Sequence, residues 1–165
     1  MSATEEKMRQ IRLVAFDVDG VFTDGRLFIG DDGVETKGFH TQDGFGVRNL
    51  LAHGFEVAVI SGRHSRAVEI RMEQLGVSHV ILGSREKEKE FRKLTAKLGL
   101  TAEQCAYVGD DVPDLPLLEI AGLSIAVANA VTEVRSVCDL TTVASGGAGA
   151  VREVCDMLVR SKVAS

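Results

Sequence analysis

The sequence predicts a doubly wound α/β fold built on a parallel sheet, and two observations carry this prediction. Five short apolar runs recur along the 165 residues. Each run is continuous instead of alternating with polar residues, as expected of parallel strands that helices cover on both faces. Segments with helical periodicity lie between the runs, so strands and helices alternate along the chain. This length supports one buried core, and we expect a single domain over residues 1–165.

The individual elements follow from these runs in chain order. We expect strands at 11–16, 57–60, 80–82, 105–108 and 123–127. Apolar residues at i, i+4 and i+7 within 68–75, and at i, i+3 and i+7 within 91–98, predict two helices between these strands. Gly76 and Gly99 directly follow the two helices, where a glycine commonly forms the C-terminal cap.

Residues 26–39 depart from this alternation. A Gly-Asp-Asp-Gly turn at 30–33 separates two short extended pieces, which predicts a β-hairpin inserted after the first strand, with its flap at about 24–40. Four apolar side chains of this segment have little core to join if the hairpin projects: Leu27, Phe28, Ile29 and Phe39. We expect the hairpin to lie over a cleft, to pair with another subunit, or to do both.

The composition is that of an ordinary globular protein and argues against several partners. Hydrophobic residues make up 45% and charged residues 26%, and a net charge of −5 disfavours a nucleic-acid or anionic membrane surface. The three cysteines, Cys105, Cys138 and Cys155, lack a paired motif and indicate buried small apolar residues in a reducing compartment. The first residues lack a secretory signal and no run reaches membrane length, so we expect a cytoplasmic protein.

Asp17 and Asp19, at the end of the first apolar run, are the most informative residues of the chain. Residues i and i+2 of an extended segment point the same way, and the carboxyl ends of such strands are where open α/β folds bind ligands. Two like charges in one small volume repel, so they need a cation, a shared proton or separate roles. The pair therefore favours a catalytic function over a purely structural one.

Two further loops carry candidate site residues. Ser61, Gly62 and Arg63 end the second strand, where a hydroxyl and free amides could hold a phosphate oxygen; Ser61 could equally cap the next helix. After the fourth strand, clustered carboxylates suit a hard divalent cation such as Mg²⁺, although a proline among them leaves a helix-capping role open. These carboxylates belong to Asp110, Asp111 and Asp114.

A lysine and a glycine-rich turn carry weaker signals. Lys87 lies in the charged run 83–89 after the third strand, and such a run is most often a solvated helix face. The glycine-rich segment 146–149 precedes the last predicted helix and could either approach a phosphate or form a flexible connection. Neither pattern identifies a site on its own.

The order of these motifs along the chain is more specific than any one of them. A carboxylate pair follows the first strand, a serine the second, a lysine the third and acidic residues the fourth. With a strand order of 3-2-1-4-5, these loops converge beside the first and fourth strands. This arrangement, from about residue 11 to residue 130, resembles the haloacid dehalogenase superfamily of phosphatases.

The resemblance implies a role for each residue. Asp17 is expected to be the nucleophile that forms an aspartyl-phosphate, and Asp19 the acid that protonates the leaving alkoxide and then activates water. Mg²⁺ is expected to bind Asp17, the backbone carbonyl of Asp19, and Asp110. Asp111 or Asp114 would support the ion. The residues implied to hold the phosphoryl group are Ser61, Gly62 and Lys87.

Longer motifs indicate a closer resemblance within that superfamily. They comprise the segments 17–25 and 39–46, the hairpin between them, Ser61-Gly62-Arg63, and the glycine-rich tail. They resemble the cap-less family of 3-deoxy-D-manno-octulosonate (KDO) 8-phosphate phosphatases, in which hairpins assemble a homotetramer and a neighbouring subunit helps to close the site. The resemblance implies Mg²⁺-dependent hydrolysis of KDO 8-phosphate in lipopolysaccharide precursor synthesis. It also implies substrate contacts by Arg63, Thr41 and Asp43.

At three positions the sequence departs from that family, so other phosphorylated sugar acids are alternative substrates. Ser61 stands where threonine is frequent, Gln42 where a basic residue is common, and Ala148 where arginine or lysine is common. Two fewer cations make a phosphatase for 2-keto-3-deoxynonulosonate or N-acylneuraminate 9-phosphate the main alternative. A response-regulator receiver is disfavoured by the order of the motifs. A non-catalytic scaffold, like the phosphatase-fold domain of some acylneuraminate cytidylyltransferases, is disfavoured because the reactive residues are present.

Overall fold

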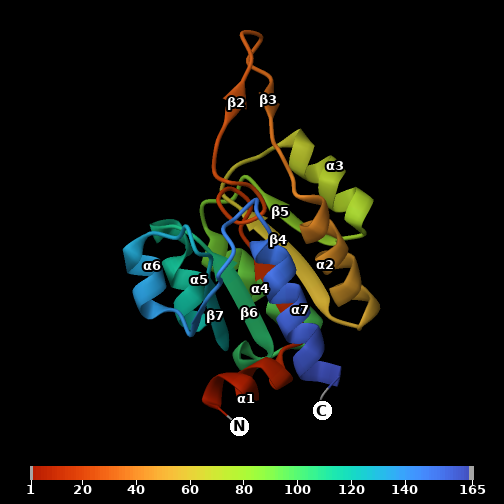
Figure 1. Ribbon diagram of the computed structural model, residues 1–165, viewed down its shortest axis with the longest axis vertical. Coiled ribbons are helices and arrows are strands. Elements are labelled where there is room, and N and C mark those ends of the chain that lie inside the picture. The colour runs from red at the N-terminus through yellow and green to blue at the C-terminus, as the bar shows by residue number, and fades with distance from the viewer. Residues whose placement is uncertain (1, 164–165) are drawn as a thin grey trace.

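The computed structural model describes residues 2–163, which form a parallel sheet with helices on both faces (Figure 1). The sheet has six strands in the order β5-β4-β1-β6-β7-β8. They are β1 (Leu13–Phe16), β4 (Glu56–Ser61), β5 (His79–Leu82), β6 (Cys105–Gly109), β7 (Leu123–Ala126) and β8 (Leu140–Thr141). The first five confirm the predicted strands, and their order is the one under which the motifs were expected to converge; all neighbours run parallel. The short edge strand β8 was not predicted.

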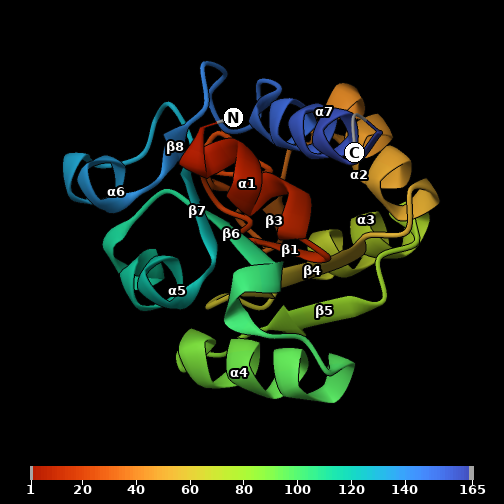
Figure 2. The same cartoon turned by 90° about the horizontal axis from the view of Figure 1, so that it is seen from below.

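The helices divide between the two faces of the sheet (Figure 2). On one face, α1 (Ala3–Gln10), α2 (Thr41–Ala52) and α7 (Ala150–Val163) pack together, with α3 (Arg66–Leu75) beside α2. The other face carries α4 (Lys87–Leu98) and α5 (Leu115–Ile120), and α6 (Thr132–Val137) packs against α5 and β7. Two 3₁₀ turns, Ala102–Gln104 and Val112–Asp114, flank β6. This two-sided cover explains why the strands are continuously apolar.

The core is continuous from the sheet into both helical layers. Every residue of β1 and β7 is buried. Phe16 of β1 packs edge-on against Phe22, and Phe91 of α4 packs edge-on against Tyr107 of β6, with ring centroids 5.4 and 6.2 Å apart. Because the central strands are held from both sides, the loops at their carboxyl ends start from fixed positions.

The predicted helix caps are confirmed. Gly76 and Gly99 follow α3 and α4 with φ angles of 80° and 67°. This left-handed conformation is strained for residues that carry a Cβ atom, so glycine ends both helices at little cost. The chain then turns toward β5 and β6.

The predicted hairpin is formed by β2 (Phe28–Ile29) and β3 (Glu35–Thr36), which pair antiparallel and project away from the sheet (Figure 1). Leu27, Phe28 and Ile29 are exposed, as expected of a projecting hairpin. Phe39 was wrongly grouped with them, because it packs against the buried core at the point where the hairpin rejoins the domain.

No helix within residues 2–163 is long and apolar enough to cross a membrane. Cys105, Cys138 and Cys155 are all free thiols, and Cys105 and Cys155 are buried. The predicted burial is therefore confirmed for Cys105 and Cys155, whereas Cys138 is only partly buried.

Candidate active site

A cavity of about 290 Å³ lies where the loops after β1, β4 and β6 meet the start of α4. The register of the sheet creates this meeting point, because β1 pairs directly with both β4 and β6. The lining draws on all four motifs that were predicted to converge: Asp17, Asp19, Gly25, Ser61, Gly62, Arg63, Lys87, Asp110, Asp111, Pro113 and Asp114.

Three carboxylates dominate the electrostatics of this cavity. Asp17, Asp110 and Asp114 each place one oxygen within 4.8 Å of the other two. Burial, followed by the charge of Asp114, raises the pKa of Asp17 well above its usual range, although Lys87 opposes this shift. Burial and the charges of Asp114 and Asp111 raise the pKa of Asp110 to about 7. A hard divalent cation would offset both the burial and the repulsion, so this oxygen donor set fits Mg²⁺.

Lys87, the first residue of α4, is the cation that the chain itself supplies. Its ammonium nitrogen lies 3.0 Å from Asp17 Oδ1 and 2.9 Å from Asp114 Oδ1. Its side chain is only 9% exposed, so the solvated-face interpretation is wrong for this residue. A buried ammonium group requires such partners to offset its lost hydration.

Asp114 orients the site because hydrogen bonds engage both of its oxygens. Oδ1 accepts from the Lys87 ammonium group at 2.9 Å and from the Tyr107 hydroxyl at 2.8 Å. Oδ2 accepts from the backbone N–H of Asp110 at 3.0 Å. Asp114 therefore fixes both Lys87 and the loop that presents Asp110. The sequence did not reveal Tyr107, which is one more large residue in a buried strand.

A helix-capping role was left open for the acidic loop and for Ser61, and the structure shows such a role only in the acidic loop. Asp111 caps the 3₁₀ turn after β6, and its side chain accepts from the backbone N–H of Val112 at 2.8 Å. Ser61 does not cap α3, since Ser65 occupies that position. Instead, Ser61 Oγ accepts from the backbone N–H of Arg63 at 3.2 Å. Ser61 ends β4 with its side chain in the cavity lining.

The glycine-rich tail braces the loop that carries Asp17 and Asp19, so its interpretation as a flexible connection is wrong. A Cβ atom on Gly146 would lie 1.9 Å from the carbonyl oxygen of Gly20. Asn129 joins these two segments, donating to the Gly20 carbonyl at 3.0 Å and accepting from the Gly146 N–H at 2.6 Å. Gly20 in turn has a φ of +84°, and a Cβ atom there would lie 1.9 Å from Asp110 Oδ2.

Two charged hairpin residues reach the site, and the sequence analysis did not identify either of them. Lys37 Nζ lies 2.5 Å from Asp19 Oδ1 and 2.9 Å from Glu35 Oε1. Glu35 also forms a close ion pair with Arg63 at the cavity lining. The base of the hairpin therefore lies beside the cleft. The i, i+2 spacing of Glu35 and Lys37, which directs both side chains to one face, was the signal available in the sequence.

Thr41 and Asp43 do not line this cavity. Asp43 is 1% exposed, and its Oδ1 accepts from the backbone N–H of Arg152 in the first turn of α7 at 2.9 Å. Burial raises the pKa of the Asp43 carboxyl group, although this hydrogen bond opposes the shift. Asp43 thus ties α2 to α7, and the substrate contacts expected of Thr41 and Asp43 remain a prediction.

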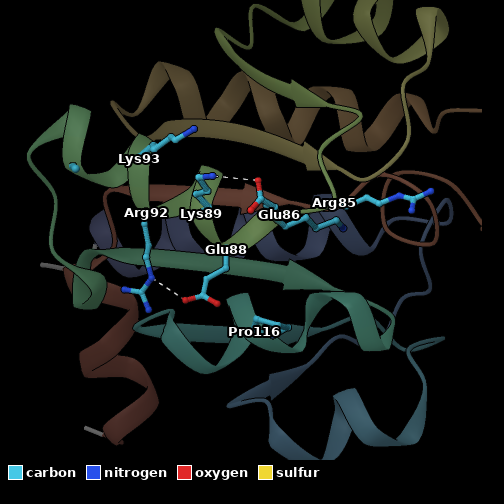
Figure 3. A pocket seen from close by; sticks show the side chains of 9 residues that line it. Arg85, Glu86, Glu88, Lys89, Arg92, Lys93 and Pro116 are labelled. Carbon is cyan, nitrogen blue, oxygen red and sulfur yellow. Dashed lines mark hydrogen bonds and ion pairs between the residues drawn. The ribbon is translucent and has the colours of Figure 1, made fainter.

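A larger hollow of about 720 Å³ lies along α4 and beside α5 (Figure 3). The side chains labelled there are Arg85, Glu86, Glu88, Lys89, Arg92, Lys93 and Pro116. Ion pairs neutralise much of its charge: Lys89 lies 3.3 Å from Glu86. Arg92 lies 2.8 Å from Glu88. Within residues 2–163, the three-carboxylate cluster belongs to the smaller cavity, which is therefore the candidate active site.

The doubly wound sheet, with carboxylates and a buried lysine at its carboxyl edge, defines a haloacid dehalogenase-like hydrolase. The family model for haloacid dehalogenase-like hydrolases matches residues 83–153. The chain is 45% identical over 153 residues to the 3-deoxy-D-manno-octulosonate 8-phosphate phosphatase KdsC of Escherichia coli (strain K12), covering 93% of this chain and 81% of the relative. The corresponding Yersinia pestis protein is 40% identical, with coverages of 93% and 82%.

Solved structures agree with this assignment. The 3-deoxy-D-manno-octulosonate 8-phosphate phosphatase of Moraxella catarrhalis, in complex with magnesium, phosphate and KDO, matches with a TM-score of 0.96 and 42% identity, covering 99% of this chain and 94% of that one. A cobalt-bound phosphatase from Haemophilus influenzae matches with a TM-score of 0.92 and 41% identity, with coverages of 95% and 92%. The chain therefore belongs to the family of 3-deoxy-D-manno-octulosonate 8-phosphate phosphatases.

Proposed function

We propose that this protein is a Mg²⁺-dependent phosphatase that hydrolyses KDO 8-phosphate to KDO and inorganic phosphate. The observation that carries the proposal is the contact of Lys87 with Asp17, 3.0 Å long, beside the carboxylate of Asp110 in one cavity. It supports the proposal because the proposed nucleophile, a cation and a proposed metal ligand lie together in a member of this phosphatase family.

The carboxylates next to β1 carry out the bond changes in this proposal. Asp17 attacks phosphorus, the bond between phosphorus and the sugar oxygen breaks, and Asp19 gives its proton to that oxygen. Water then attacks the aspartyl-phosphate while Asp19 accepts a proton, which releases phosphate and restores Asp17. Both residues line the cavity and follow the carboxyl end of β1 along the chain.

The metal would be held by Asp17, Asp110 and the backbone carbonyl of Asp19, with Asp111 and Asp114 as supporting groups. When bound, Mg²⁺ would neutralise the repulsion between the nucleophilic carboxylate and the phosphate dianion. The raised pKa values of Asp17 and Asp110 support a cation at this position, because both carboxylates lack sufficient compensation from Lys87 alone. Asp114 supports the site through its hydrogen bonds to the Lys87 ammonium group and the Asp110 N–H.

The phosphoryl oxygens would be bound by Ser61, the backbone at Gly62, and Lys87. A Cβ atom on Gly62 would lie 4.0 Å from Lys87 Cε, so these elements from β4 and α4 face one another closely. Preorganised donors of this kind stabilise charge that develops in the transition state. Arg63, at the outer side of this group and half-exposed, is the proposed contact to the sugar-acid carboxylate.

The test is phosphate release from KDO 8-phosphate in Mg²⁺ and in EDTA, beside nonulosonate and neuraminate 9-phosphates. We expect Mg²⁺-dependent turnover with a preference for the eight-carbon substrate. A preference for a nine-carbon substrate would retain the chemistry and reject the substrate assignment. No turnover of any ester by folded, Mg²⁺-supplemented protein would reject the phosphatase proposal.

We also propose that the hairpin flaps assemble a homotetramer. Phe28, Ile29 and Val34 are 57%, 64% and 61% exposed on a hairpin that projects from the domain, and such a cluster favours burial against another copy. The test is light scattering after size-exclusion chromatography of Ile29→Asp, with Val137→Asp on α6 as the control. We expect dissociation in the hairpin variant alone; an unchanged mass for Ile29→Asp would contradict this assembly.

A further inference from the structure

Four side chains at the mouth of the candidate active site form a closed ring of alternating charge. Lys37 Nζ contacts Asp19 Oδ1 at 2.5 Å and Glu35 Oε1 at 2.9 Å. Arg63 forms a close ion pair with Glu35 Oε2, and Arg63 Nε lies 3.7 Å from Asp19 Oδ2. Two carboxylates and two cations thus alternate, with one of each supplied by the hairpin.

The side chains of this ring are covered to different degrees at the edge of the cavity. The Lys37 side chain is 1% exposed, the Glu35 side chain 19%, and the Arg63 side chain 49%. A covered ammonium group must have fixed carboxylate partners, so Lys37 anchors the Glu35 carboxylate at a defined place. Glu35 then presents its other oxygen to Arg63, which remains open to the cavity.

The Glu35 carboxylate occupies the guanidinium group of Arg63. Arginine binds a planar carboxylate through its forked donors, and here that partner is an internal carboxylate. Under the proposed function, on which this inference rests, the substrate carries a carboxylate of its own together with its phosphate. The Glu35 carboxylate and the substrate carboxylate would then compete for the same guanidinium group, which also lies 3.7 Å from Asp19 Oδ2.

We propose that Glu35 is an internal competitor for the substrate carboxylate, occupying Arg63 in the free enzyme and yielding it when a sugar acid binds. Lys37 retains Glu35 at the hairpin base during this exchange, because its contact to Glu35 involves the opposite carboxylate oxygen. Glu35 is therefore a specificity-determining residue. It weakens the binding of every carboxylate ligand and leaves phosphate binding unaffected, since the proposed phosphate-binding residues, Ser61 and Lys87, are outside the ring.

The experiment measures inhibition of p-nitrophenyl phosphate hydrolysis by free KDO and, separately, by inorganic phosphate. Glu35→Gln keeps the size and polarity of the side chain but removes its charge. We expect the inhibition constant for KDO to fall by about two- to fivefold, the effect expected of a half-exposed ion pair. The inhibition constant for inorganic phosphate should stay unchanged. Asp31→Asn, which removes one charge from the exposed turn of the same hairpin, is the matched control and should change neither constant.

A second variant separates competition from a structural effect. Arg63→Met should weaken inhibition by KDO, and adding Glu35→Gln to it should produce no further gain. An inhibition constant for KDO that is unchanged or raised in Glu35→Gln would overturn the inference, as would an equal gain in the Arg63→Met background. If KDO 8-phosphate is not a substrate but Glu35→Gln still strengthens inhibition by KDO, the proposed function fails while the competition by Glu35 stands.

Discussion

Replacing Lys87 by methionine tests the electrostatic design of the site most sharply. Methionine preserves much of the apolar stem but removes an ammonium group held 3.0 Å from Asp17 and 2.9 Å from Asp114. Breaking a buried ion pair by removing one partner costs about 3–5 kcal/mol of unfolding free energy. Loss of a preorganised donor to the phosphoryl group lowers kcat by about 10²–10³, which corresponds to about 3–4 kcal/mol in the activation barrier.

The assay pairs denaturant unfolding with steady-state phosphate release at saturating Mg²⁺. The matched control is Lys89→Met on the same helix, because Lys89 is 58% exposed and pairs with Glu86 at the surface. An exposed pair of this kind contributes at most about 1 kcal/mol, so the control should retain full activity. A folded Lys87→Met protein with the kcat of the wild type would refute our assignment of Lys87 to the reacting phosphoryl group.

Three further predictions address the rest of the structure. Asp17→Asn should abolish turnover without lowering the melting temperature, because burial and the charge of Asp114 disfavour the Asp17 carboxylate and Asp114 still pairs with Lys87; residual kcat near the wild-type value would exclude Asp17 as nucleophile. Gly20→Ala should weaken Mg²⁺ activation at least about tenfold, because its Cβ would meet Asp110 Oδ2 at 1.9 Å and φ is +84°; a Mg²⁺ titration that matches the wild type would contradict this packing. Partial burial raises the pKa of Asp139, but hydrogen bonds from Lys7 and Ser124 outweigh it and lower that pKa below its usual value. The charged Asp139 carboxylate therefore stabilises the fold at neutral pH, and this stabilisation is lost as the pH falls through the folded-state pKa. Thermal melts of Asp139→Asn should therefore differ from wild type at pH 7 and converge in acid. A difference that persists in acid would count against a stabilising ion pair between Lys7 and Asp139, whose Nζ and Oδ1 atoms lie 2.5 Å apart.

Much of the fold was predictable because a parallel sheet leaves a strong signal. Strands covered on both faces are continuously apolar, and this identified five of the six strands of the sheet. Their order was only the condition under which the motifs converge, and the sheet meets that condition. The edge strand β8 has only two residues, Leu140 and Thr141, one of them exposed, so no apolar run marks it. Gly76 and Gly99 were recognisable as caps because their conformation is nearly restricted to glycine.

Site residues that directly follow a strand could be predicted from the sequence. Site residues whose roles depend on tertiary contacts alone could not. Asp17 and Asp110 stand at strand ends, which fixes their place at the sheet edge. Lys87 was visible only through the order of the motifs, since its charged neighbours are solvated. Lys37 acquires its environment from the base of the hairpin beside the cleft, and Tyr107 acquires its role from a hydroxyl that donates to Asp114. The i, i+2 spacing of Glu35 and Lys37 indicates only a shared face, and no local pattern encodes the contacts themselves.

The most direct test of the proposed function compares phosphate release from KDO 8-phosphate with that from the nine-carbon sugar-acid phosphates, each in Mg²⁺ and in EDTA. We expect rapid release from the eight-carbon ester in Mg²⁺ and loss of activity in EDTA. Equal or faster release from a nine-carbon ester would contradict the substrate assignment, and full activity in EDTA would contradict a metal at Asp17 and Asp110.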